Sequence, residues 1–282
     1  MASDHQSHEG LEHLELDLFL EAIYRYHGYD FRSYSKASMK RRVRQLRVIS
    51  GHATIADMIP RVLHDRIFFE QVLKTFSISV TEFFRDPYLF NTVREKLVPL
   101  LKTWPNIKIW HAGCATGEEV YSLAILLKEE GLYDRTTIYA TDFSSDALEQ
   151  ATAGIYEPAR LQEGTRNYQK AGGARSFSEY YHAKYGAAVM DPSLKERLVF
   201  SNHNLATDGV FGEMHLIFCR NVLIYFNREL QDRALGLFAE SLTHGGFLCL
   251  GSKESIRFSQ VQSCFKNIDD HAKIYKKQAS FE

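Results

Sequence analysis

Acidic side chains follow two short apolar segments in the middle of the chain, where parallel strands would end. Glu118 and Glu119 come after a turn that contains Gly113, and Asp142 closes the apolar run 138–141. Glycine lets a backbone approach a ligand closely, but two carboxylates at the start of a helix would repel a pyrophosphate. The pattern therefore predicts a site for a positively charged ligand.

S-adenosylmethionine is a positively charged ligand of this kind, because it carries a sulfonium and an α-ammonium. Glu118 could face its amino-acid end, and Asp142 could accept hydrogen bonds from both ribose hydroxyls. Two plainer interpretations stay open: the glutamates complement the helix dipole, and Asp142 belongs to the cap of the next helix. The two acidic positions together favour the ligand.

Polar residues after two later apolar segments extend the candidate site. Asn204 could contact an adenine edge and Leu205 could form an apolar wall, although an asparagine in a loop is more often a turn residue. Arg220 and Asn221 follow directly on a buried run. An arginine so close to a core must find a carboxylate or solvent.

Two further positions suggest roles close to the reacting atoms. Thr81 and Arg85 are expected within one helical turn of each other, and Arg85 can bind a carboxylate of the cofactor or of a substrate through two hydrogen bonds. We favour the cofactor for Arg85 and expect Tyr225 to orient the acceptor. Arg85 and Tyr225 are thus the candidate catalytic residues.

Alternating strands and helices would position these residues. A parallel, doubly wound α/β sheet is indicated, because parallel strands need covering crossovers and bind ligands outside their carboxyl ends. The expected strands are 107–110, 138–141, 197–201, 215–219 and 246–251, and the expected helices are 119–130, 145–153 and 228–242.

Two segments depart from this alternation. Apolar residues at helical spacing predict a helical N-terminal domain and linker helix over 11–100, after a disordered start at 1–10. The irregular stretch between Gly154 and Lys195 is too long for a structureless loop, which predicts a small subdomain at about 156–196 inserted in a domain over 101–282.

Composition excludes several classes of protein. The formal net charge of −1 gives no general attraction to nucleic acid or a membrane. The four cysteines show no paired spacing for zinc or redox chemistry, and no metal site is expected. The chain lacks a continuous apolar run long enough to span a bilayer, and its polar start is unlike a signal peptide, which predicts a cytoplasmic protein.

Six motifs, taken together, resemble the CheR-type chemotaxis receptor methyltransferases. The likeness covers nearly the whole chain, from Met39 to about Tyr275. The motifs are, in order, VTEFFRD, WHAGCATGEEVYS, ATDFSSDALEQATAGIY, HNL, FCRNVLIYF and GGFLCLGSKES.

The resemblance implies a Rossmann-like S-adenosylmethionine methyltransferase domain, an N-terminal helical domain and a small antiparallel β subdomain. The cofactor contacts that it implies are Thr81, Arg85, Glu118, Asp142, Asn204, Leu205, Arg220 and Asn221, with Tyr225 near the transferred methyl group. Ser79 replaces the family's usual asparagine, so a weakened cofactor contact is expected there. Basic residues that would meet the acidic cytoplasmic helices of chemoreceptors are Lys40, Arg41, Arg42, Arg44 and Arg47.

The activity implied is transfer of a methyl group to receptor glutamates, which gives methyl esters and leaves S-adenosylhomocysteine. Two alternatives stay open: a methyltransferase of the same family that serves a non-chemotactic signalling array, and a cofactor-binding adaptor without turnover. The basic segment could also bind nucleic acid, but it is short and has apolar residues on one face, so an acidic receptor helix is favoured. A monomer that does not insert into membranes is expected.

Overall fold

The computed structural model describes residues 2–76, 81–184 and 186–279, and the chain divides into two compact units. The first unit is Met1–Ile78 with Ile224–Arg233, and the second is Ser79–Leu223 with Ala234–Glu282. The division falls at Ile78–Ser79 and not near residue 100, because the helices of the linker region belong to the second unit.

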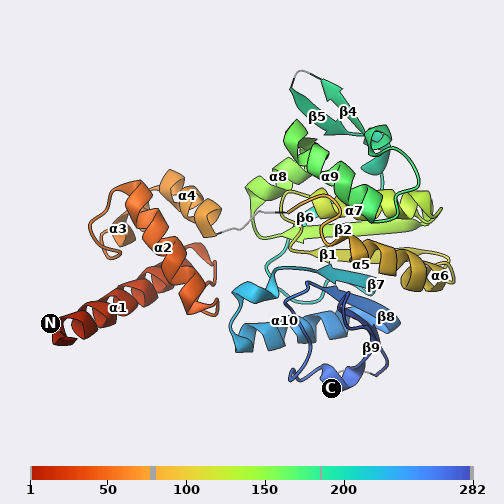
Figure 1. Cartoon of the computed structure of the whole chain (residues 1–282). Helices are drawn as coiled ribbons and strands as arrows, with labels where there is room; N and C mark the ends of the chain where they lie inside the picture. The colour runs from red at the N-terminus through yellow and green to blue at the C-terminus, as the bar shows by residue number, and fades with distance from the viewer. Residues whose placement is uncertain (1, 77–80, 185, 280–282) are drawn as a thin grey trace. The chain divides into compact units, whose positions relative to one another are not determined.

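The first unit is helical (Figure 1). Its helix α1 begins at Ala2, where a disordered start was expected. Phe19 and Ile23 on α1 are fully buried, and the Phe76 ring meets the Phe19 ring edge-on at 6.4 Å between centroids. The helices are α1 (Ala2–His27), α2 (Lys36–Ser50), α3 (Met58–His64) and α4 (Arg66–Phe76).

Helix α2 follows from its sequence. Met39, Val43 and Leu46 recur on one helical face and are buried. The helix ends where Gly51 adopts a left-handed φ of 71°, which glycine tolerates because it has no Cβ. The remaining positions of α2 carry the basic residues.

The second unit contains a seven-stranded sheet of order β6-β2-β1-β7-β8-β10-β9. Strands β6, β2, β1, β7 and β8 are parallel, as the sequence predicts, but β10 is antiparallel to β8 and to β9. The antiparallel pair was not foreseen. The strands are β1 (Ile107–Ala112), β2 (Thr136–Asp142), β6 (Leu198–Asn202), β7 (Met214–Cys219), β8 (Leu242–Leu250), β9 (Phe265–Asp269) and β10 (Ile274–Lys277).

Helices cover this sheet and its core. In α7 every residue from Glu118 to Leu127 is buried, as expected of a helix enclosed on all sides. The indole of Trp110 on β1 is also fully buried and donates to the Thr141 hydroxyl at 2.9 Å. The other helices are α5 (Pro87–Thr92), α6 (Val98–Leu101), α8 (Ser145–Ala153) and α10 (Arg228–Ser241), with a π-helical turn at Val93–Leu97 between α5 and α6.

The predicted insertion is a small antiparallel sheet accompanied by a helix. Its strand order is β3-β5-β4, and α9 (Pro158–Lys170) lies between β3 and β4 in the chain. The β4–β5 hairpin projects beyond α9 in Figure 1. Its strands are β3 (Ile155–Tyr156), β4 (Tyr181–Lys184) and β5 (Ala187–Met190). The subdomain was predicted, but α9 was not.

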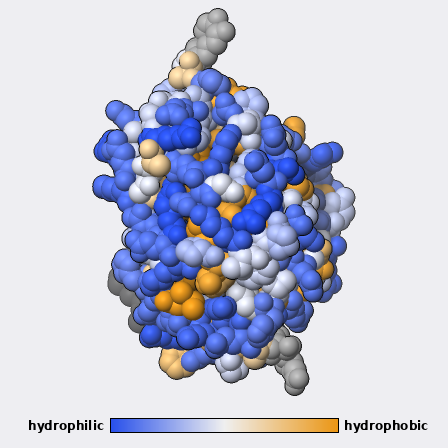
Figure 2. Space-filling model, turned by 90° about the vertical axis from the view of Figure 1, so that its right-hand side faces the viewer, coloured by the Kyte–Doolittle hydropathy of each residue, from blue (hydrophilic) through white to orange (hydrophobic). Residues whose placement is uncertain are grey.

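The surface seen in Figure 2 is mostly hydrophilic, with hydrophobic residues in small areas. None of the described helices combines the length and apolar character that crossing a bilayer requires. All four cysteines are buried as free thiols.

Candidate active site

The loop after β1 is fixed to the end of β2. The amides of Gly113 and Cys114 both donate to the Thr141 carbonyl, at 2.8 and 2.9 Å. A Cβ on Gly113, whose φ is +72°, would come within 2.4 Å of Val222. Val222 thus occupies the space that a side chain at position 113 would need, and the predicted close approach of a ligand to the Gly113 backbone stays a prediction.

Glu118 is the first residue of α7 and is completely buried. Its carboxylate accepts a hydrogen bond from the Thr116 hydroxyl at 2.6 Å and forms an ion pair with Arg160. Burial raises the pKa of Glu118, although both partners oppose the shift. The predicted ammonium contact is thus a desolvated carboxylate at a helix start.

Asp142 ends β2 and is 8% exposed. One carboxylate oxygen accepts from the Ala115 amide at 2.9 Å, and the other accepts from the Ser144 amide at 3.0 Å. Burial raises the pKa of Asp142 against these hydrogen bonds. Glu118 and Asp142 therefore bind neighbouring residues of one loop, and their joint role in binding a ligand stays a prediction.

The segment after β6 reaches the same strand end. The His203 amide donates to the Asp142 carbonyl at 3.2 Å, and Leu205 is buried. The Asn204 side chain accepts from the Ala206 amide at 2.9 Å and so forms a turn. The plainer interpretation of Asn204 is thus realised, while the adenine contacts of Asn204 and Leu205 remain predictions.

Arg220 is held in a buried network of charges. Its guanidinium donates to Glu119 and Asp86, each at 2.5 Å, and to the Arg85 carbonyl at 3.3 Å. Burial alone would raise the pKa of Glu119, but Arg220 and His111 together hold that pKa below its usual value. Arg220 therefore finds the carboxylates that its position demanded, and the geometry favours a supporting role over direct cofactor contact.

Asn221 follows in a strained conformation, with φ of 59°. The amides of Asn221, Val222 and Gly251 all donate to the buried Glu254 carboxylate, at 3.0, 2.9 and 2.6 Å. Among the residues that the structure describes, the buried Asn221 Oδ1 has no hydrogen-bond partner. Glu254 was not singled out from the sequence, although it lies in the last of the six motifs.

Thr81 and Arg85 do not share a helical turn. Residues 81 and 82 have no regular structure, and 83–86 form a turn followed by a bend, in which Phe84 and Asp86 adopt positive φ values of 52° and 54°. The expected helix does not form because Phe83 and Phe84 are both buried, and the Phe84 amide donates to Ser122 at 2.9 Å. Ser79 lies outside the described residues.

Tyr225 and the basic residues belong to the first unit. The Arg42 guanidinium lies over the Tyr225 ring at 5.0 Å, and the Ser35 amide donates to the Tyr225 carbonyl at 2.7 Å. Because the other predicted cofactor residues belong to the second unit, the position of Tyr225 near the methyl group stays a prediction.

The basic residues of α2 differ in exposure. Arg42 is 4% exposed and donates to the Phe76 carbonyl, so it cannot meet a receptor helix as expected. Burial lowers the pKa of Arg42. Arg41 and Arg44 are exposed, and Lys40 and Arg47 are partly exposed.

Two of these basic residues share an acidic partner. Arg44 and Lys40 both pair with Glu12 on α1, at 2.5 and 3.1 Å, and Arg44 lowers the pKa of Glu12 to about 2. Arg47 donates to the Ala53 carbonyl at 3.2 Å. Arg41 and Arg44 are therefore the most exposed of these basic residues, and Arg44 already pairs with Glu12.

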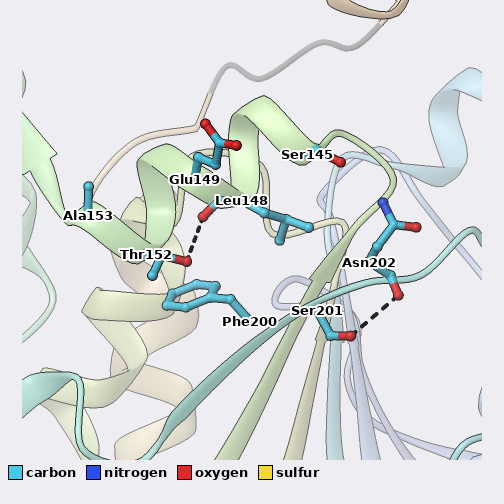
Figure 3. A pocket seen from close by; sticks show the side chains of 8 residues that line it. All are labelled: Ser145, Leu148, Glu149, Thr152, Ala153, Phe200, Ser201 and Asn202. Carbon is cyan, nitrogen blue, oxygen red and sulfur yellow. Dashed lines mark hydrogen bonds between the residues drawn. The ribbon is translucent and has the colours of Figure 1, made fainter.

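A pocket of about 490 Å³ lies beside the candidate site, between α8 and β6. Figure 3 shows Phe200 and Leu148 forming its apolar part and Asn202 at its edge. Its full lining is Ser145, Leu148, Glu149, Thr152, Ala153, Phe200, Ser201 and Asn202. None of the predicted cofactor contacts that the structure describes lines it, so it is distinct from the site built around Glu118 and Asp142.

A mostly parallel sheet with acidic residues at a loop-to-helix start and at the next strand end defines a Rossmann-like nucleoside-binding domain of the methyltransferase class. The chain belongs to the CheR methyltransferase family: the SAM binding domain of that family matches residues 79–274, and its all-alpha domain matches residues 14–77. The cofactor is therefore S-adenosylmethionine, and the product is S-adenosylhomocysteine.

Three relatives illustrate the match. A Pseudomonas putida protein named as methyltransferase Cher3 is 53% identical over 264 residues, which cover 94% of this chain and 97% of that one. A chemotaxis protein methyltransferase of Listeria innocua is 29% identical, over 84% of this chain and 88% of its own. Chemotaxis protein methyltransferase 1 of Vibrio cholerae is 36% identical, over 62% and 64%.

The residues of the site fit this cofactor. Glu118 and Asp142 supply acceptors and negative charge for a cationic ligand with ribose hydroxyls, and the buried Asn221 Oδ1 is an acceptor without a partner in the described part of the chain. Carboxylates in these places suit an adenosyl sulfonium better than a diphosphate.

Proposed function

We propose that the protein transfers a methyl group from S-adenosylmethionine to glutamate carboxylates on the cytoplasmic helices of methyl-accepting chemotaxis receptors. The methyl ester and S-adenosylhomocysteine are the products. Support for this substrate comes from the relatives in Listeria and Vibrio, which are named chemotaxis protein methyltransferases. The observation that carries the proposal is the pair of buried carboxylates, Glu118 and Asp142, bonded to one loop.

The cofactor supplies an electrophilic methyl group on a sulfonium. We assign Glu118 to its ammonium and Asp142 to its ribose hydroxyls, with Asn204 and Leu205 beside the adenine. Arg220 donates to the Arg85 carbonyl, and we assign Thr81 and Arg85 to the cofactor.

The acceptor needs no general base. A glutamate carboxylate has an ordinary pKa of about 4.3 and is ionised at neutral pH. The protein must instead position the carboxylate in line with the methyl group, and such positioning is worth roughly 7–11 kcal/mol of barrier. We assign Tyr225 to orient the acceptor.

The receptor helix would meet α2. Its exposed arginines, Arg41 and Arg44, provide positive charge for a helix that carries several glutamates. Arg42 is excluded from this surface by its burial.

The experiment is methyl transfer from tritiated S-adenosylmethionine to membranes that contain candidate receptors. We expect radioactivity that base releases as volatile methanol, and we expect Asp142→Ala to abolish it, while Arg228→Ala, a change on the surface of α10, retains it. Cofactor binding without any methanol release would favour the adaptor, and release from proteins other than chemoreceptors would favour another signalling array.

A further inference from the structure

Arg160 of the inserted subdomain reaches the carboxylate that we assign to the cofactor's ammonium. Its guanidinium donates to Oε1 of Glu118, while the Thr116 hydroxyl occupies Oε2. The side chain of Arg160 is 43% exposed, whereas that of Glu118 is fully buried. A solvent-exposed cation thus contacts a buried anion at the candidate site.

The placement of Arg160 is unfavourable for its own helix. Arg160 lies in the first turn of α9, which contains no acidic residue, and a cation there opposes the helix dipole. Stabilisation of α9 therefore does not explain an arginine at this position. Glu118 is the group that offsets the charge.

The start of α9 is held close to the cofactor loop. Just before α9, the Tyr156 hydroxyl donates to the Thr116 carbonyl at 2.7 Å. Further along α9, the Asn167 side chain donates to the Phe83 carbonyl at 3.1 Å. These bonds tie the subdomain to both segments that carry predicted cofactor residues, so the contact of Arg160 with Glu118 follows from fixed surroundings.

We propose that Glu118 and Arg160 together recognise the zwitterionic amino-acid end of the cofactor, with Glu118 bound to the α-ammonium and Arg160 bound to the α-carboxylate, which it shares with Arg85. A guanidinium suits this role because its planar fork can bind a carboxylate through two hydrogen bonds. With the ligand bound, each charge of the pair gains a partner of opposite sign. The proposal rests on the assignment of Glu118 in the proposed function and adds a residue from the insertion to the site.

Calorimetry with three ligands separates the two contacts. S-adenosylhomocysteine carries both charged groups, its decarboxylated analogue keeps only the amine, and 5′-methylthioadenosine has neither. The variants are Arg160→Ala and Arg160→Lys, with Arg166→Ala as the matched control, because Arg166 is exposed on the same helix. Thermal unfolding of each variant checks that the fold is retained.

We expect Arg160→Ala to weaken the binding of S-adenosylhomocysteine by about tenfold to a hundredfold, the range for hydrogen bonds to charged groups. It should leave the affinities for the decarboxylated analogue and for 5′-methylthioadenosine unchanged, and Arg160→Lys should lose less than the alanine variant. The control should bind all three ligands like the parent protein.

Other results overturn the proposal. An equal loss of affinity for S-adenosylhomocysteine and its decarboxylated analogue would mean that Arg160 does not bind the carboxylate. Unchanged affinity would mean that it makes no contact, and tighter binding would mean that Arg160 competes with the ammonium for Glu118. If the parent protein itself binds S-adenosylhomocysteine no better than 5′-methylthioadenosine, the assignment of Glu118 fails independently.

Discussion

The carboxylates of Glu118 and Asp142 are buried at a cost. Burial raises the pKa of both groups, because the ionised form loses its hydration. A ligand with an ammonium near Glu118 offsets this loss, since the pair of opposite charges is stronger where water is excluded. The free protein thus holds two buried carboxyl groups in a place that favours a cationic ligand.

This predicts a pH dependence of ligand binding. The ammonium favours ionised Glu118, so its pKa is higher in the free protein than in the complex, and affinity for S-adenosylhomocysteine falls as the pH drops through the free-protein value. Calorimetry over an acidic pH series measures the fall. 5′-Methylthioadenosine is the control, because it lacks the ammonium and reports only groups near the nucleoside, such as Asp142. Parallel pH profiles for the two ligands would contradict the assignment of Glu118.

The stability of the fold does not follow the same trend with pH as the ligand affinity does at these two groups. A carboxyl group whose folded-state pKa is raised binds a proton more tightly in the folded state than in the unfolded state. Lowering the pH through that pKa therefore favours folding at this group. A loss of affinity together with retained stability would identify the ligand contact.

At the scale of elements, the loop between β1 and α7 carries the site. Gly113 combines a positive φ with close contact to Val222, and its amide is bonded to the end of β2. The same loop presents Ala115 to Asp142 and Thr116 to Glu118. A shift of this loop would therefore displace both acidic contacts together.

Replacement of Gly113 by alanine is expected to destabilise the fold and to weaken cofactor binding. Gly131→Ala is the matched control, because Gly131 has a similar φ of +69° and a Cβ added there would meet nothing within 4 Å. The control should cost about 1 kcal/mol from the left-handed conformation, and Gly113→Ala should cost about 1–3 kcal/mol more from overpacking. Urea unfolding measures the loss of stability in both variants. Equal losses would show that the Val222 side chain moves aside for the added methyl group.

Helix α2 is the element that we assign to the receptor. Charge reversal at Arg41 and Arg44 should slow receptor methylation several-fold at low salt, because positive charge speeds encounter with an acidic helix. The affinity for S-adenosylhomocysteine should not change. Arg66→Glu on α4 is the control, since Arg66 is also highly exposed on a helix of the first unit. Equal losses of methylation and cofactor affinity would contradict this division of roles.

The sequence predicted the elements that carry the site better than those at its border. The five parallel strands have strong apolar runs, and β1, β2 and β7 lie within one or two residues of their expected bounds at the carboxyl ends. The pair β9 and β10 was missed because its pairing with β8 depends on tertiary context. Helix α9 was missed because its buried residues are only Leu161, Gly164 and Tyr168, and one of these is a glycine.

Site residues were predicted best where local sequence decides their place. Glu118 and Asp142 lie where the strand-to-helix pattern put them. Arg220 was expected at the cofactor, but its partners Glu119 and Asp86 are far away in sequence, and only the fold shows that they enclose it. Arg160 was missed for the same reason, because its contact with Glu118 joins two separate segments.

At the scale of the whole molecule, the chain crosses three times between its two units, after Ile78, Leu223 and Arg233. The segment Ile224–Arg233 belongs to the first unit, although the residues on either side of it belong to the second. Tyr34 and Phe226 form an isolated bridge with their rings 5.0 Å apart, and the Asn227 amide donates to the Ser33 carbonyl at 2.9 Å. The N-terminal helices therefore hold the segment that carries Tyr225.

This connectivity predicts that the two parts stay associated after the chain is cut between Ile78 and Ser79. A protease site introduced there would yield fragments that elute together in size-exclusion chromatography, because the 224–233 segment of the larger fragment packs in the helical unit. Phe226→Ala should promote separation, since it removes the ring contact with Tyr34. Phe258→Ala is the control, because Phe258 is 84% exposed in the second unit. Separation of the parent fragments under the same conditions would show that these contacts do not hold the 224–233 segment. It would also contradict the expectation that the helical unit positions Tyr225.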